Sequence, residues 1–242
     1  MLDFNNKEVG SALKLDGKVY VLIFYVGTPS HPVTAQTREE WGTQVFEAQH
    51  WLQRQASRYG KHIEFENAAY GMDGSLVLEE IPFGPETPNA YYFPDEVYNL
   101  LKCKNGWDMF RFIRTFAHCD HYMSIILCNV KGRSFSCPVS KELYSFNKEE
   151  FFFESCVLYR YDAVDYVLKS TSASIAHEIL HLFGATDLYA HDDTPEEQVI
   201  EEKFRHIYPN SIMLGAPYGI ERTEVDELNA WLVGWCDKPK YL

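Results

Sequence analysis

The sequence lacks the segments that would send a chain into or across a membrane. Residues 1–8 contain no basic stretch followed by an apolar one, so they do not resemble a secretory signal. The chain also has no run of about 18 apolar residues, the length needed to span a bilayer. We therefore expect a cytoplasmic protein that does not bind membranes, with export by a non-classical route as the alternative.

Clusters of basic residues and paired cysteines are lacking as well. Lys and Arg number 22 against 35 Asp and Glu, which gives a net charge of −13. Nucleic acids and anionic membrane surfaces are bound mainly through Lys and Arg, so this charge argues against both as partners. The six cysteines follow no disulfide or metal-ligand spacing, and we expect them to be reduced thiols.

Apolar residues are abundant enough to build a sizeable core. Hydrophobic residues make up 46% of the chain and aromatic residues 15%, which is typical of a globular protein and not of a disordered one. At 242 residues, with no internal repeat or low-complexity tract, the chain is expected to form one domain over residues 1–242.

The pattern of apolar residues predicts strands and helices in alternation. The expected strands cover residues 18–26, 62–68, 122–130, 134–139 and 151–161. The expected helices cover residues 37–59, 95–103, 107–118, 170–183, 194–207 and 223–235. Thr37 is the expected cap of the first helix, and Thr194 followed by Pro195 is typical of a helix start. Residues 71–94 are rich in Gly, Pro and Asn and are expected to form an irregular surface insertion.

The most informative feature is the run His-Glu-Ile-Leu-His-Leu-Phe-Gly-Ala-Thr-Asp from His177 to Asp187. On a helix, His177 and His181 project from the same face and can bind one metal ion. Glu178 lies beside the first ligand, where a carboxylate can take a proton from metal-activated water. Gly184 allows a sharp turn off the helix, and this turn would bring Asp187 back as a third ligand. Two histidines and one aspartate leave a fourth position open, as in catalytic zinc sites.

Other residues compete with Asp187 for the third position. His191, Asp192 and Asp193 follow within a few residues and would reach the metal if their loop folded back. We favour Asp187 because it lies three residues after Gly184, which is the offset expected for the third ligand of such a motif. The simplest alternative is that Asp187 is a solvent-exposed carboxylate at the end of a helix.

These residues resemble the zinc motif of the metzincin metallopeptidases, His-Glu-x-x-His-x-x-Gly-x-x-His, with Asp187 in place of the third His. The same replacement marks the snapalysin-like branch of this clan. Met213, which lies 32 residues after His181, looks like the methionine of the clan's Met-turn beneath the metal. Tyr218, which follows Pro217, is similar to the tyrosine of the Pro-x-Tyr segment that borders the substrate pocket in the matrixin branch.

The resemblance implies an α/β (α+β) fold of the metzincin or zincin-like type. Such a fold has a twisted, mostly parallel sheet with backing helices, a zinc helix, and a small C-terminal subdomain with the Met-turn and a terminal helix. The upper subdomain would cover about residues 1–184 and the lower one about 185–242. The segment 71–118 would be an insertion relative to a minimal member. The motifs themselves span only residues 177–218.

The resemblance also implies a zinc metalloendopeptidase that acts on protein or peptide substrates. One catalytic Zn²⁺ would be held by His177, His181 and Asp187, with Glu178 as general base and acid. Tyr218 would contact the oxyanion or line the substrate pocket. An active intracellular peptidase needs restraint, which narrow specificity or an inhibitory partner would provide. The rival hypothesis is a catalytically restricted or inactive, zinc-stabilised protein-binding module. Glu178 argues against it, because a purely structural zinc site does not need a base.

Overall fold

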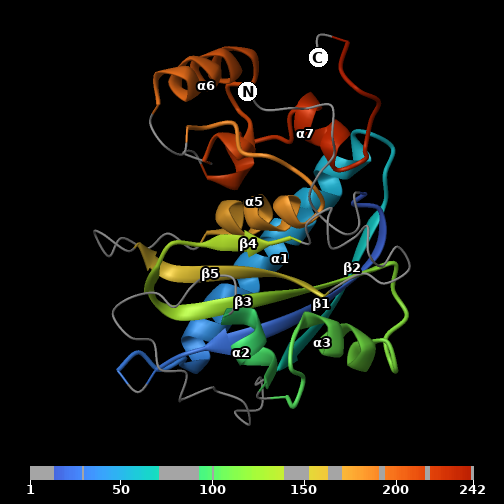
Figure 1. Ribbon diagram of the computed structural model, residues 1–242, viewed down its shortest axis with the longest axis vertical. Helices are drawn as coiled ribbons and strands as arrows, with labels where there is room; N and C mark the ends of the chain where they lie inside the picture. The colour runs from blue at the N-terminus through green and yellow to red at the C-terminus, as the bar shows by residue number, and fades with distance from the viewer. Residues whose placement is uncertain are drawn as a thin grey trace.

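A five-stranded sheet with the order β2-β1-β3-β5-β4 forms the centre of the structure (Figure 1). The computed structural model describes residues 14–28, 30–70, 93–99, 101–138, 153–162, 171–190, 194–215 and 219–240. The strands are β1 (Gly17–Val26), β2 (Ile63–Tyr70), β3 (His121–Gly132), β4 (Phe135–Cys137) and β5 (Glu154–Asp162). Neighbouring strands pair in parallel, except that β4 pairs antiparallel with β5 at the edge of the sheet. The fold is therefore α/β with a mostly parallel mixed sheet, in agreement with the expected fold class.

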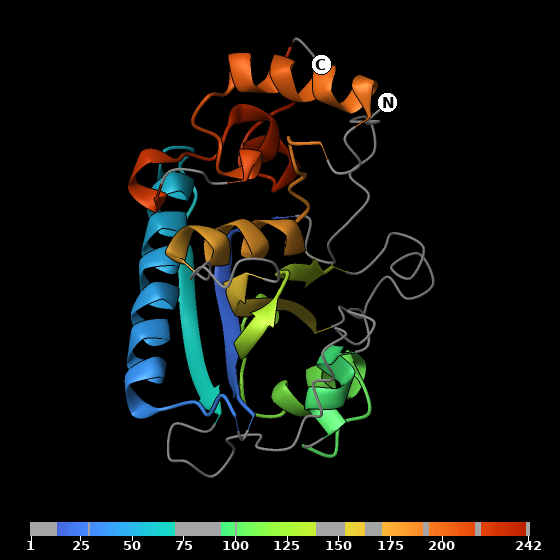
Figure 2. The same ribbon diagram turned by 90° about the vertical axis from the view of Figure 1, so that its left-hand side faces the viewer.

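The central strands are buried on both faces. From Val19 to Val26, every residue of β1 is buried, and the same holds for β3 from Met123 to Val130. Odd-numbered residues of β1 join a core with helices α1 and α5, and even-numbered residues join a second core with α2 and α3. Figure 2 shows α1 and the pair α2–α3 on opposite faces of the sheet. Burial on both faces explains why these strands have continuous apolar sequences.

The helices flank the sheet and follow it at the C-terminal end. They are α1 (Ala35–Ser57), α2 (Phe93–Asn99), α3 (Gly106–Ile113), α5 (Ser172–Leu182), α6 (Pro195–Ile207) and α7 (Glu227–Leu232). Two short 3₁₀ helices are η2 (Ile212–Leu214) and η3 (Ile220–Arg222). None of the helices within the described ranges combines the length and apolar character that a bilayer span requires.

Helix starts differ from the sequence prediction where another polar residue provides the cap. Thr34, and not Thr37, caps α1, and the Thr34 side chain accepts a hydrogen bond from the Thr37 backbone N–H. Helix α7 begins after Asp226 and not at Thr223, because the Asp226 carboxylate accepts the hydrogen bond of the third helical N–H. The predicted start of α6 after Thr194 is confirmed. Most of the predicted insertion, residues 71–92, lies outside the described residues.

The six cysteines are free thiols, as the sequence predicts. Three of them, Cys103, Cys128 and Cys156, are buried, and the other three are half-buried. Burial raises the pKa of five of these thiols, and that of Cys119 reaches about 11; the five are Cys103, Cys119, Cys128, Cys137 and Cys156. A thiol with a raised pKa is a weak nucleophile and a poor metal ligand at neutral pH.

The segment after α5 forms a cap at one end of the sheet (Figures 1 and 2). The core beneath α1 and α5 continues into this segment and includes Phe204, Met213 and Trp235. The residues just before β1 also contact this C-terminal segment, because the Trp235 indole Nε1 donates a hydrogen bond to the Leu15 carbonyl oxygen at 2.6 Å. The C-terminal segment is thus packed against the sheet layer through a shared core.

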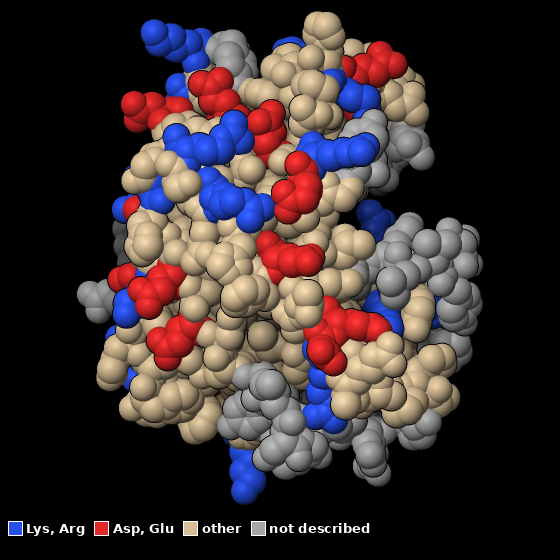
Figure 3. All heavy atoms as spheres, turned by 180° about the vertical axis from the view of Figure 1, so that it is seen from behind, with Lys and Arg blue, Asp and Glu red and all other residues tan. Residues whose placement is uncertain are grey.

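Ion pairs join the end of α1 to this C-terminal segment. Arg54 lies 3.3 Å from Glu221 and Arg58 lies 3.2 Å from Glu224, measured between guanidinium nitrogen and carboxylate oxygen. All four side chains are exposed, so each pair contributes at most about 1 kcal/mol. Figure 3 shows that basic and acidic side chains are interspersed on the back face, so the negative charge does not form one continuous patch there.

Trp51 of α1 is fully buried in the core, as Trp41 of the same helix is, and should contribute strongly to stability. It is 2% exposed, whereas Phe46 on the same helix is 59% exposed. We expect Trp51→Ala to lower the free energy of unfolding by about 3–5 kcal/mol, because it removes an aromatic side chain from a packed core. Phe46→Ala is the matched control and should change it by less than about 0.5 kcal/mol. Urea unfolding of both variants measures the difference, and equal effects would contradict this packing.

Candidate metal centre

Helix α5 carries the first two predicted ligands into the core. Its start is capped by Thr171, whose side chain accepts from the Ser174 backbone N–H. Nearly every residue of the helix is buried, because the helix packs between the sheet, α1 and the C-terminal segment. Gly184 follows the helix with a φ of 101°, in the left-handed region that favours glycine. This confirms the predicted sharp turn, which directs the chain back toward the histidines.

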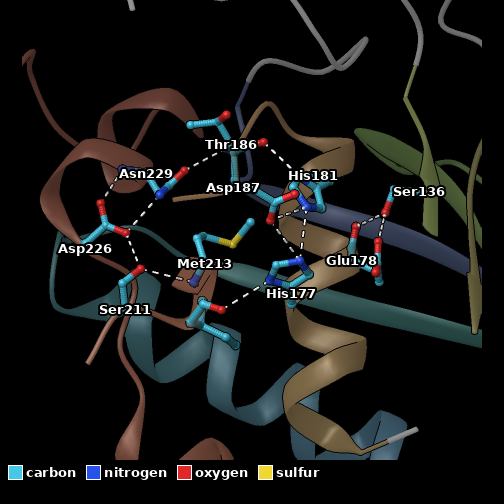
Figure 4. A network of polar contacts seen from close by, with 12 residues as sticks. Ser136, His177, Glu178, His181, Thr186, Asp187, Ser211, Met213, Asp226 and Asn229 are labelled. Carbon is cyan, nitrogen blue, oxygen red and sulfur yellow. Dashed lines mark hydrogen bonds and ion pairs between the residues drawn. The ribbon is translucent and has the colours of Figure 1, made fainter. Parts of the chain in front are cut away.

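The structure brings His177, His181 and Asp187 together at one point (Figure 4). The Nε2 atoms of the two histidines are 3.2 Å apart. Asp187 Oδ1 lies 3.2 Å from the Nε2 of His177 and 3.3 Å from that of His181. Zinc–ligand bonds of about 2.0–2.2 Å in a tetrahedron place neighbouring ligand atoms about 3.3–3.6 Å apart. The three atoms therefore form one face of a tetrahedron of nearly the size that zinc requires.

Backbone carbonyls orient both imidazole rings. The Nδ1 of His177 lies 3.2 Å from the Ile212 carbonyl oxygen, and the Nδ1 of His181 lies 2.9 Å from that of Ala185. A carbonyl oxygen only accepts, so each Nδ1 carries the hydrogen, and in the neutral ring Nε2 presents its lone pair. Three electron-rich atoms then face one another and repel unless a cation or protons lie between them. The donor set consequently fits a divalent zinc ion.

The members of this cluster shift one another's pKa values in opposite directions. Burial by itself lowers the pKa of His181, but the hydrogen bond and negative charge of Asp187 raise it above its usual value. Burial by itself raises the pKa of Asp187, but the neighbouring imidazoles of His177 and His181 hold it well below its usual range, since they stabilise its ionised form. Asp187 therefore stays ionised and is not the exposed carboxylate of the simplest alternative, since its side chain is only 14% exposed.

Glu178 is buried next to this cluster without being one of its ligands. Its side chain extends toward β4, where the Ser136 hydroxyl lies 2.6 Å from Glu178 Oε2 (Figure 4). The same hydroxyl lies 2.8 Å from the Glu178 carbonyl oxygen. A hydroxyl–carboxylate contact of this length is a strong charge-assisted hydrogen bond. Ser136 thus holds the orientation of the carboxylate beside the two histidines.

Met213 occupies a tight turn packed against α5. Ser211 caps this turn by accepting from the Met213 backbone N–H, and Gly215 ends it with a φ of 85°. Met213 is fully buried, and Figure 4 shows its side chain turned toward the histidine cluster. Its carbonyl accepts from the Leu188 N–H at 2.8 Å, which joins the turn to the loop that carries Asp187.

Sequence reasoning missed Tyr189. Its ring stacks against His177 with centroids 6.3 Å apart and an interplanar angle of 23°. Burial and the carboxylates of Asp187 and Glu178 raise the pKa of Tyr189, so its hydroxyl stays protonated. Its position immediately after the ligand segment is the only sequence signal that could have indicated it.

Several predicted residues cannot be compared with the structure. Tyr218, the predicted oxyanion or pocket residue, lies outside the described residues, as do His191, Asp192 and Asp193. Among the residues that the structure describes, His177, His181 and Asp187 are the group whose ligand atoms converge.

Comparison with known proteins gives no match, so functional conclusions rest on the geometry of His177, Glu178, His181 and Asp187. No family model matches the chain, and no curated protein matches it significantly.

Proposed function

We propose that the protein is a zinc-dependent peptidase of the metzincin type. The observation that carries the proposal is the convergence of His177, His181 and Asp187 within 3.3 Å of one another, with Glu178 on the same helix. A metallohydrolase needs three ligands that leave a fourth position open and a carboxylate base, and these four residues would supply both.

His177, His181 and Asp187 would hold the ion, since their donor atoms match the ligands that zinc prefers. When bound there, zinc supplies a Lewis acid that polarises a peptide carbonyl and lowers the pKa of water. Glu178 accepts a proton from the attacking water and passes it to the leaving amine. Its Oε2 is engaged by Ser136, so Oε1 is the atom assigned to this transfer.

Further features support the metzincin type in particular. The sheet is mostly parallel with an antiparallel strand, β4, at the edge nearest α5, and a smaller segment with α6 and α7 follows the zinc helix. Met213 would be the Met-turn methionine, and Asp187 would be the third ligand of the snapalysin-like branch. The division into subdomains near residue 184 and the role of Tyr218 in the pocket belong to the same proposal.

The rival hypothesis, a zinc-stabilised binding module, predicts metal without turnover. The hydrogen bond between Ser136 and Glu178 favours the peptidase, because a structural zinc site gains nothing from an oriented carboxylate that does not bind the ion. Zinc content of the purified protein and cleavage of casein or random peptides test the proposal. One zinc per chain with cleavage supports it, and folded protein that binds no zinc overturns it.

Ser136 is expected to contribute to turnover through Glu178. Ser136→Ala should lower kcat by at least about tenfold, because a hydrogen bond to a charged group contributes about 1.5–3 kcal/mol. KM and zinc content should stay unchanged, since Ser136 contacts Glu178 and not the three ligands. Steady-state kinetics measure the effect. Ser136→Thr, which keeps the hydroxyl, should recover activity, and Ser57→Ala on the exposed face of α1 is the control. An equal loss in the threonine variant would count against this role.

A further inference from the structure

A buried polar network at the start of α7 extends to two of the three candidate metal ligands, His177 and Asp187 (Figure 4). Asp226 caps α7, and its Oδ1 accepts from the Asn229 backbone N–H at 2.9 Å. Its Oδ2 accepts from the Ser211 hydroxyl at 2.6 Å and from the Asn229 side-chain Nδ2 at 2.9 Å. All three residues are almost completely buried. A helix cap needs only the first of these bonds, so the other two call for another explanation.

One branch of this network leads to the third ligand. Because Asn229 Nδ2 donates to Asp226, its Oδ1 faces the other way and accepts from the Thr186 backbone N–H at 2.8 Å. Thr186 immediately precedes Asp187. On the other side of Asp187, the Leu188 N–H donates to the Met213 carbonyl at 2.8 Å. The backbone is therefore held on both sides of Asp187, in a stretch with no helix or strand of its own.

A second branch leads to the first ligand. The Ser211 hydroxyl that donates to Asp226 also accepts from the Met213 N–H at 3.1 Å, which shapes the turn around Ile212. The Ile212 carbonyl is the acceptor for His177 Nδ1 at 3.2 Å. A single buried carboxylate, that of Asp226, is thus connected to His177 through one branch and to the Asp187 segment through the other.

We propose that Asp226 and Asn229 are positioning residues that hold the ligand segment of Asp187 in its binding geometry before the metal arrives, and so raise metal affinity. This inference rests on the metal site of the proposed function. A loop without such anchors would be ordered only on binding, and the conformational entropy lost at that step would weaken affinity. The network removes this loss because it orders the segment during folding.

Zinc affinity of the whole chain, measured by competition with a chelator of known affinity, tests the inference without any substrate. Asn229→Ala removes the acceptor for Thr186 and should weaken zinc binding about 10- to 100-fold, the effect typical of residues that orient metal ligands. Asn67→Ala is the matched control, because its amide pairs with Gln49 at 2.7 and 2.8 Å in another part of the fold. Its zinc affinity should equal that of the wild type.

A second variant separates helix capping from ligand positioning. Asp226→Asn retains a good cap for α7 but replaces one of the acceptor oxygens with a donor, so the branches to Ser211 and Asn229 cannot both persist. We expect the metal-free protein to remain folded but to unfold at a lower midpoint, because a buried donor loses its acceptor, and we expect zinc binding to be weakened. This variant decides the question if Asn229→Ala does not fold. Zinc bound as tightly as by the wild type overturns this inference alone, whereas a wild-type protein that binds no zinc overturns the proposed function together with it.

Discussion

Glu178→Gln should abolish peptide hydrolysis while leaving metal binding intact. The amide has the size and shape of the carboxylate and still accepts a hydrogen bond from Ser136. However, it cannot take a proton from water, and loss of a general base lowers kcat by about 10²–10⁴-fold. Glu178 is not among the converging ligands, so the zinc content should remain that of the wild type. Cleavage of casein or random peptides, with metal analysis of the same preparations, measures both quantities.

The control for this experiment is Glu39→Gln, which makes the same chemical change on the exposed face of α1. It should cleave as fast as the wild type. If Glu178→Gln also cleaved at the wild-type rate, Glu178 would not be the base. If the wild type contained zinc and neither protein cleaved any peptide, the binding module would become the better hypothesis.

Asp187→Asn should remove most of the affinity for zinc. The neutral amide oxygen is a much weaker ligand than a carboxylate, and the substitution deletes the negative charge that lies 3.2 Å from His177 Nε2 and 3.3 Å from His181 Nε2. We expect affinity to fall by more than about 100-fold, beyond the 10- to 100-fold typical of residues that merely orient a ligand. Competition with a chelator measures the change directly.

Thermal unfolding provides a second readout of the same loss. A ligand present at about 1,000 times its Kd stabilises the folded state by about 4 kcal/mol, so zinc should raise the unfolding temperature of the wild type. It should have little effect on Asp187→Asn. Asp192→Asn is the informative comparison, because Asp192 is a competing candidate ligand. If Asp192→Asn lost zinc binding and Asp187→Asn kept it, the third ligand would be misassigned.

The sequence predicted the local backbone geometry of the candidate site, namely the helix and the turn after it. The four-residue spacing of His177 and His181 determines that both side chains lie on one helical face, whatever that helix packs against. Gly184 has the left-handed backbone conformation that a sharp turn after the helix requires. Both features depend on residues that are close in the chain, and backbone geometry alone is enough to derive them.

Secondary structure was predicted less completely, and the differences have a common cause. The central strands β1 and β3 were evident as mainly apolar runs, because they are buried on both faces. The exact first residues of α1 and α7 could not be predicted, because several neighbouring polar residues can act as caps and packing selects one of them. The antiparallel direction of β4 depends on its pairing with β5, which a short strand does not encode by itself.

The amino-acid sequence by itself determined which residues are the candidates for binding a metal and for acting as a base. The tertiary structure decided which hydrogen bonds hold these residues in place. Ser136 donates to Glu178, the Ile212 carbonyl accepts from His177, and Asn229 accepts from the backbone beside Asp187. These partners are 35 to 43 positions apart in the chain. Hydrogen bonds over such distances exist only once the helices and the sheet edge are packed together, and no local pattern in the sequence marks them in advance.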